Sequence, residues 1–155
     1  MATTASLDPT GVFQYKNDIY IADTNNHGIR KIDRNGIIST IAGTGESGYN
    51  GDGILATDAS LCQPYSVFVH NDQVFISDHL YCKKILPNGI IKNIEGVESG
   101  FNGDDMLATQ LHYPKGIFVD FDSHIYIADV ANNCIRRIDQ NGIMETGEKG
   151  YSGDV

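Results

Sequence analysis

The fold of this chain is decided by one five-residue stretch that occurs three times: Ile19-Tyr20-Ile21-Ala22-Asp23, Val74-Phe75-Ile76-Ser77-Asp78 and Ile125-Tyr126-Ile127-Ala128-Asp129. Two further motifs recur with it. These are the dipeptide Asn-Gly and a glycine-rich turn of the form Gly-aromatic-Asn/Ser-Gly-Asp. Self-similarity with a period of about fifty residues is typical of β-propellers and repeat arrays. We therefore predict a single repeat domain, residues 1–155, with blades over approximately 2–53, 54–105 and 106–155.

Each unit predicts four short strands. In the first unit the runs 11–13, 19–23, 29–33 and 37–42 are rich in β-branched and aromatic residues, and Asn, Gly and Asp separate them. The second run places isoleucines on one face and Tyr20 with Ala22 on the other, so both faces are apolar. A strand that is apolar on both faces is buried on both faces. We therefore expect an all-β fold of antiparallel sheets, each packed between neighbours as in a propeller.

Three strings of the first unit together resemble the NHL repeat: Ile-Tyr-Ile-Ala-Asp (19–23), Asn-Asn-His-Gly-Ile-Arg-Lys-Ile (25–32) and Asn-Gly-Ile-Ile-Ser-Thr-Ile-Ala-Gly-Thr-Gly (35–45). The connection Gly-Tyr-Asn-Gly-Asp-Gly (48–53) is similar to that of the longer variety of this family. The resemblance covers essentially the whole chain and implies four-stranded antiparallel blades in a propeller that usually has six. Its members include protein-binding and RNA-binding modules, sensor domains and a few metal-dependent lyases, so the resemblance leaves the function open.

Three blades do not make a closed ring, because propellers typically have about four to eight. An open arc would expose an apolar face at each end, and large exposed apolar patches usually mark interfaces. We expect two chains to join head to tail as a homodimer with six blades, burying on the order of 2,000 Å². The alternative is that the chain is a fragment of a longer NHL-repeat protein that supplies the other blades.

Composition excludes several classes of partner. The chain has 155 residues and a net charge of −9, and its lysines and arginines form no basic patch. Nucleic acid and anionic membranes both require such a patch, so neither is expected as a partner. The three cysteines are too few and too unevenly placed for a disulfide framework. With no signal peptide evident, a complete chain would be cytoplasmic, and the location of a longer parent protein stays open.

Metal and catalytic motifs are weak. The glycine-rich turns with Asp52, Asp104 and Asp154 each offer two oxygen ligands, whereas a calcium loop of the EF-hand type needs about six. We interpret them as structural turns. Nucleophile, phosphate-binding and dinucleotide motifs are missing from the sequence. We therefore expect no catalytic residue, no metal ligand and no cofactor. The alternative is a metal-dependent lyase or hydrolase that uses calcium or zinc at the channel mouth.

The polar residues of the strands have structural interpretations. An aspartate ends the second strand of every unit, and we expect it to tie down the loop that follows. Arg30 and Arg136 lie on the third strands close to acidic residues, which predicts salt bridges at a solvated blade edge.

The most plausible function is a non-catalytic scaffold that binds a protein or a small ligand. A site should lie where the repeat breaks its own pattern. In the second unit the loop after the second strand is two residues shorter, and in the third unit the last strand is truncated. We expect binding residues in these loops and among the aromatic residues of the glycine-rich turns: His27, His79, Tyr81, Tyr49, Phe101 and Tyr151.

Overall fold

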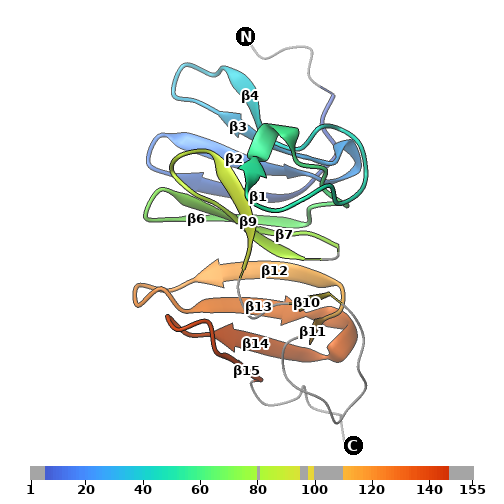
Figure 1. The fold of residues 1–155 in the computed structure, drawn as a ribbon. Coiled ribbons are helices and arrows are strands. Elements are labelled where there is room, and N and C mark those ends of the chain that lie inside the picture. Colours follow the sequence, from blue (N-terminus) through green and yellow to red (C-terminus); the bar gives the residue numbers. More distant parts are fainter. Residues whose placement is uncertain (1–5, 80, 95–97, 100–109, 147–155) are drawn as a thin grey trace, which may run out of the picture.

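The structure, a computed structural model, describes residues 6–79, 81–94, 98–99 and 110–146. Three antiparallel sheets stack face to face in chain order (Figure 1). The first contains β1 (Pro9–Tyr15), β2 (Asp18–Asp23), β3 (Gly28–Ile32) and β4 (Ile38–Ala42). The second contains β6 (Ser66–His70), β7 (Gln73–Ser77), β8 (Cys82–Ile85) and β9 (Ile90–Asn93). The third contains β12 (Pro114–Val119), β13 (Ile125–Asp129), β14 (Cys134–Ile138) and β15 (Met144–Thr146). The expected all-β fold is confirmed.

Smaller elements lie in the connections. Single turns of 3-10 helix form η1 (Thr24–Asn26), η2 (Ala56–Asp58) and η3 (Val130–Asn132), and β10 (Glu98–Ser99) pairs in parallel with β11 (Gln110–Leu111). The sequence predicted four strands per blade, but the second sheet has a fifth. This strand, β5 (Ile54–Leu55), comes from the connection between blades and pairs with β9. The described part of the last strand in the third unit is β15, and it begins at the same register position as β4. The end of the segment for which the sequence predicts a short strand lies outside the described residues. Among the described residues, no helix is long and apolar enough to cross a membrane.

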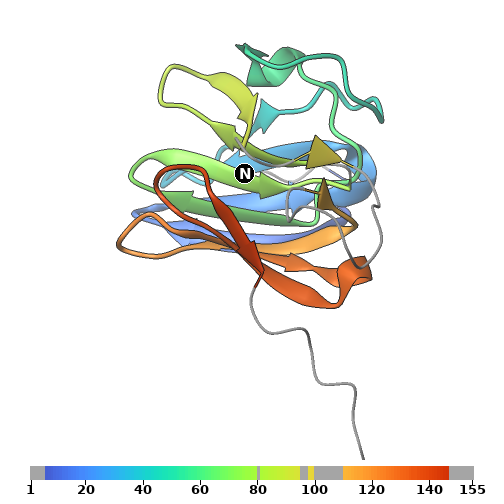
Figure 2. The same ribbon diagram turned by 60° about the horizontal axis from the view of Figure 1, so that its bottom comes forward.

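The first strand of each sheet lies at the inner edge of the arc. Phe13, Phe68 and Phe118 occupy equivalent positions on β1, β6 and β12. The ring centroids of successive pairs are 4.3 and 5.0 Å apart, so the three side chains stack from blade to blade. Figures 1 and 2 both show the hairpin turns on one side of the stack and the longer loops on the other. We call these sides the hairpin edge and the loop edge.

The middle sheet is buried on both faces, as the apolar pattern of its second strand predicted. Val74 and Ile76 pack into a core shared with the first sheet. Phe75, between them on β7, packs into a core shared with the third sheet. Alternation along a strand sends successive side chains to opposite faces, so this one strand contributes to both cores.

The two ends of the arc are open. Val12 of β1 is 70% exposed, whereas the equivalent Val67 and Ile117 are 3% and 7% exposed between sheets. At the other end, Ile135 of β14 is 50% exposed, while the equivalent Ile29 of β3 is fully buried. We call the surface around Val12 and Ile19 the leading face. We call the surface with Phe118, Val130 and Ile135 the trailing face. Each is an apolar sheet face of the kind that the arc buries internally.

Candidate functional site

A buried aspartate anchors the first blade. Oδ1 of Asp23 accepts hydrogen bonds from the backbone N–H of Asp8 at 2.8 Å and from Nδ2 of Asn26 at 2.7 Å. Its Oδ2 accepts from Nε of Arg30 at 2.8 Å. Burial alone would raise the pKa of Asp23, but these bonds stabilise the charged form and lower it. The carboxylate therefore joins the entering chain, the following loop and the third strand, rather than the following loop alone.

The third blade repeats this anchor. Asp129 accepts from the backbone N–H of His112 at 2.8 Å, from Nδ2 of Asn132 at 2.8 Å and from Nε of Arg136 at 3.0 Å. The sequence predicted a solvated salt bridge for this arginine. It is instead mostly buried, and it pairs with a fully buried carboxylate. Breaking such a pair is costly because a buried charge would lose its partner.

The second blade lacks both side-chain partners of the anchor. Its shortened loop has no asparagine to reach Asp78, and Lys83 stands where the other blades carry arginine. Asp78 still accepts the backbone N–H of Cys62, at 2.9 and 3.0 Å to its two oxygens. Within the described residues, no cation lies within ion-pair distance of it. Burial consequently raises the pKa of Asp78 to about 6.

The ammonium group of Lys83 is held by two tyrosines instead. Its Nζ lies 4.4 Å from the ring centroid of Tyr49 and 4.8 Å from that of Tyr81, and it donates to Oδ1 of Asn93 at 2.8 Å. The side chain is almost fully buried, and this burial lowers its pKa. Two of the predicted binding residues, Tyr49 and Tyr81, therefore meet around a lysine. Sequence reasoning missed this lysine, although its exchange for arginine beside the shortened loop was a usable signal.

His79 lies in the shortened loop at the loop edge. Its backbone N–H donates to the carbonyl of Cys62 at 3.1 Å, which ties the loop to the chain entering the blade. The imidazole packs edge-on against Tyr113 of the third blade, with centroids 4.4 Å apart, and the ring centroid of Tyr65 lies 6.4 Å away. Within the described residues, Nδ1 of His79 is buried without a hydrogen-bond partner.

His27 occupies the corresponding loop of the first blade, just after η1. Its backbone is left-handed, with φ of 50°, and its Nδ1 accepts from the backbone N–H of Gln63 at 3.3 Å. His27, Gln63, Tyr65, His79 and Tyr113 thus form a row that crosses from blade one to blade three. We call it the loop-edge row. Two of the six predicted residues belong to it.

The other predicted residues are placed differently. Tyr49 and Tyr81 surround Lys83 as described above. Phe101 and Tyr151 lie outside the described residues.

The ionisable groups around the second-blade anchor are enclosed by the fold. Burial raises the pKa values of Asp78 and of the Cys82 thiol and lowers that of Lys83, and all three side chains are buried. Aromatic rings such as those of Tyr49 and Tyr113 reach the surface. Among the described residues, no group of three or more His, Cys, Asp or Glu side chains is arranged to hold a metal ion. The exposed rings offer surface on which a ligand could stack.

The stacked four-stranded sheets define the chain as a β-propeller arc, and comparison with solved structures agrees. Virginiamycin B lyase from Staphylococcus aureus superposes with a TM-score of 0.62 at 20% identity, over 97% of this chain and 44% of that one. A protein of unknown function from Bacteroides thetaiotaomicron gives 0.63 at 19% identity, over 94% and 37%. A gluconolactonase-like structure gives 0.56 at 12% identity, over 84% and 44%. At such identities the likeness establishes the fold alone.

One curated relative is also similar in sequence. Protein SUPPRESSOR OF QUENCHING 1, chloroplastic, from Arabidopsis thaliana is 34% identical over 143 residues. The match covers 85% of this chain but only 13% of that much longer protein. No family model matches the chain.

Proposed function

We propose that the chain is a three-blade NHL-type arc that serves as a non-catalytic binding scaffold. The observation that carries the proposal is the loop-edge row, in which side chains from all three blades line up on one side of the arc. Tyr65 and His79 are half-buried and Tyr113 is exposed, so the rings are fixed by packing and still offer surface to a ligand. Fixed aromatic surface with a few polar groups is the usual lining of a binding site.

The row suits a protein segment or a small ligand that stacks on aromatic rings. Aromatic rings provide a large contact area, and they lose little conformational freedom when they are already packed. The amide side chain of Gln63 and the imidazole of His79 add polar groups on the same side. The ligand's own chemistry is therefore expected to be apolar with one or two hydrogen-bonding groups.

The scaffold is completed, in this proposal, when the leading face of one copy packs on the trailing face of another. Both faces carry side chains that are buried wherever two blades of the arc meet, as the Val12 and Ile135 comparisons show. The arc accounts for somewhat under half of the lyase chain that shares its fold. Two copies would therefore supply the blades of one six-bladed ring.

A second origin of the missing blades has its own support. The curated relative is far longer than the stretch it shares with this chain. Further blades of a longer polypeptide could cover the same two faces. The measured mass of the isolated chain, discussed below, separates the two origins.

A binding screen tests the scaffold function. Fragments and short peptides are titrated into the labelled chain, and the imidazole resonances of His27 and His79 are followed by NMR. We expect binders that shift both signals and lose affinity in Tyr113→Ala. The matched control is Phe121→Ala, because Phe121 is a fully exposed ring in the β12–β13 turn at the hairpin edge. Binders that are insensitive to Tyr113→Ala, or turnover that depends on stoichiometric calcium or zinc, would contradict the proposal.

A further inference from the structure

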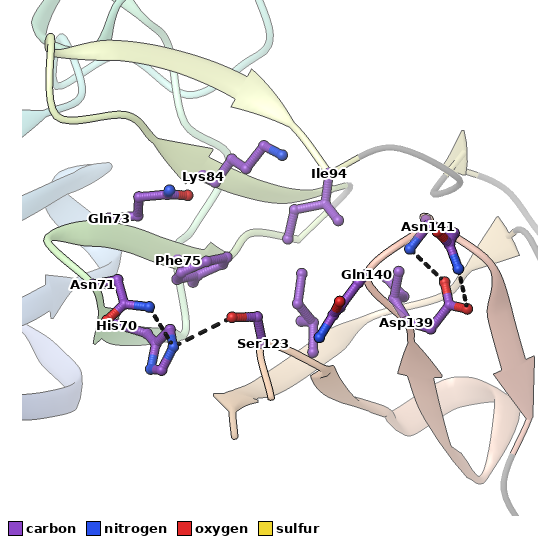
Figure 3. A pocket seen from close by; sticks show the side chains of 13 residues that line it. His70, Asn71, Gln73, Phe75, Lys84, Ile94, Ser123, Asp139, Gln140 and Asn141 are labelled. Carbon is purple, nitrogen blue, oxygen red and sulfur yellow. Dashed lines mark hydrogen bonds between the residues drawn. The ribbon is translucent and has the colours of Figure 1, made fainter. Parts of the chain in front are cut away.

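A cavity of about 480 Å³ lies between the second and third sheets at the hairpin edge (Figure 3). Its base is formed by the buried side chains of Phe75, Ile94, Ile125 and Ile138. Cavities that hold small molecules have volumes of roughly 300–1,000 Å³ and mostly apolar walls. This space is therefore large enough for a small ligand, and it lies on the side of the arc opposite the loop-edge row.

The cavity exists because the second blade junction is filled less well than the first. Between blades one and two, Tyr15 and an ion pair of Lys16 with Asp72 at 2.6 Å occupy the hairpin edge. At the next junction the position of Tyr15 is taken by His70. Its ring contacts Ser123 of blade three through a hydrogen bond of 3.5 Å (Figure 3). The smaller ring and the missing ion pair leave the space between the sheets open.

The wall of the cavity carries the ammonium group of Lys84, which has no ion-pair partner among the described residues. Lys84 is equivalent to Lys31 of the first blade, which forms an ion pair with Asp18 at 2.7 Å. In the second blade the position of this aspartate is taken by Gln73. Lys92 lies directly opposite Lys84 on β9, and like charges in this arrangement repel. Among the described residues, neither lysine has a carboxylate within ion-pair distance.

Asp139 is the acidic residue of the described cavity lining, and its carboxylate is occupied elsewhere. Oδ1 accepts the backbone N–H groups of Asn141 and Ile143, both at 2.8 Å. Oδ2 accepts from Nδ2 of Asn141 at 3.3 Å, and Figure 3 shows the two bonds from Asn141. The bond from Ile143, with those from Asn141, lowers the pKa of Asp139. These bonds hold the carboxylate on its own hairpin turn, so it does not serve as the counter-ion of Lys84.

We propose that this cavity binds a small organic anion with an aromatic or apolar body. The acidic group of the ligand, a carboxylate or a phosphate, pairs with Lys84 and supplies the charge that Asp18 supplies in blade one. The body packs on the apolar base around Phe75 and Ile125. His70 and Gln73 on the rim offer hydrogen bonds to the same group. The site is separate from the scaffold function proposed above and does not depend on it.

Calorimetric titration of the full chain tests this site. Benzoate and phenyl phosphate are the anionic probes, and benzamide is the neutral probe of the same shape. We expect saturable binding of at least one anion, about tenfold tighter than benzamide, since a half-buried ion pair contributes about that much. Lys84→Gln should remove this preference. Lys31→Gln, the equivalent change in blade one, should leave it unchanged.

A second variant keeps the proposal testable if Lys84→Gln disturbs the fold. Gln73→Asp recreates the internal ion pair of blade one, and we expect it to abolish anion binding while the far-UV circular dichroism spectrum stays native. Benzoate-selective binding shows a carboxylate ligand, and selectivity for phenyl phosphate shows a phosphate. Equal affinity for benzamide, equal effects of the two lysine variants, or undiminished anion binding in Gln73→Asp would overturn the proposal.

Discussion

Truncation of two equivalent isoleucines, one buried between blades and one on the trailing face, tests whether the trailing face is covered. Ile29 and Ile135 occupy the same repeat position, but the first is fully buried and the second is 50% exposed. Truncating a fully buried isoleucine side chain to alanine costs about 2–5 kcal/mol, because the lost burial of apolar surface adds to the cost of the cavity left behind. In an isolated arc the half-exposed Ile135 should cost only about 1 kcal/mol.

Closure of the ring changes this comparison. If a second copy covers the trailing face, Ile135 becomes as buried as Ile29. Ile135→Ala should then lower the free energy of unfolding by the same amount, about 2–5 kcal/mol. Association is governed by mass action, so the cost of Ile135→Ala should rise with protein concentration. The cost of Ile29→Ala should stay constant.

Urea unfolding followed by far-UV circular dichroism measures both costs, because the chain has no tryptophan. Wild type, Ile29→Ala and Ile135→Ala are compared at low and at high micromolar concentration. The reasoning is refuted if Ile135→Ala costs about 1 kcal/mol at both concentrations while Ile29→Ala shows its full cost.

Three further predictions concern single residues. Gly43→Ala should destabilise the fold by about 2–4 kcal/mol in thermal unfolding, since the φ of Gly43 is +97° and a Cβ would overlap a neighbouring loop's backbone. Gly45 has a similar φ of +89° but open space around it, so Gly45→Ala should cost only about 1 kcal/mol. Equal losses of stability in the two variants would contradict this prediction. Asp129→Ala should cost about 3–5 kcal/mol in urea, because Arg136 loses its buried partner; a cost near zero would show that the anchor is dispensable. The pKa of Asp78 is raised to about 6, so between pH 4 and 6 the folded state keeps this proton while the unfolded state releases it. The free energy of unfolding should therefore fall by up to about 3 kcal/mol as pH rises through this window. Asp78→Asn should lack this fall, and equal pH dependence of unfolding in wild type and Asp78→Asn would contradict the prediction.

The sheets could be predicted from sequence because their signal is local and repeated. The pattern of Ile19 to Ala22, apolar on both faces, requires a neighbour on each side, and the structure supplies one for every inner face. The hairpin turn that precedes β15 was also readable, from the recurring Asn-Gly dipeptide at 141–142. Both features depend on spacing along the chain and not on the details of packing.

The contacts of the second blade could not be predicted in the same way. The position of Lys83 between Tyr49 and Tyr81 depends on how a connection from the preceding blade folds over the sheet. The extra strand β5 has the same origin, because its two residues pair only once that connection is placed. The cavity beside Lys84 depends on side-chain size at two junctions, which a repeat pattern does not encode.

The most direct test of the central claim, that the arc closes its two apolar faces on a second copy, is the absolute mass of the chain in solution. Light scattering behind size exclusion measures it across a dilution series. The account predicts a particle of twice the 16.9 kDa chain mass that dissociates only at high dilution. A particle of 16.9 kDa at every concentration would contradict closure by a second copy. Further blades of a longer polypeptide would then be left as the cover of the two apolar faces.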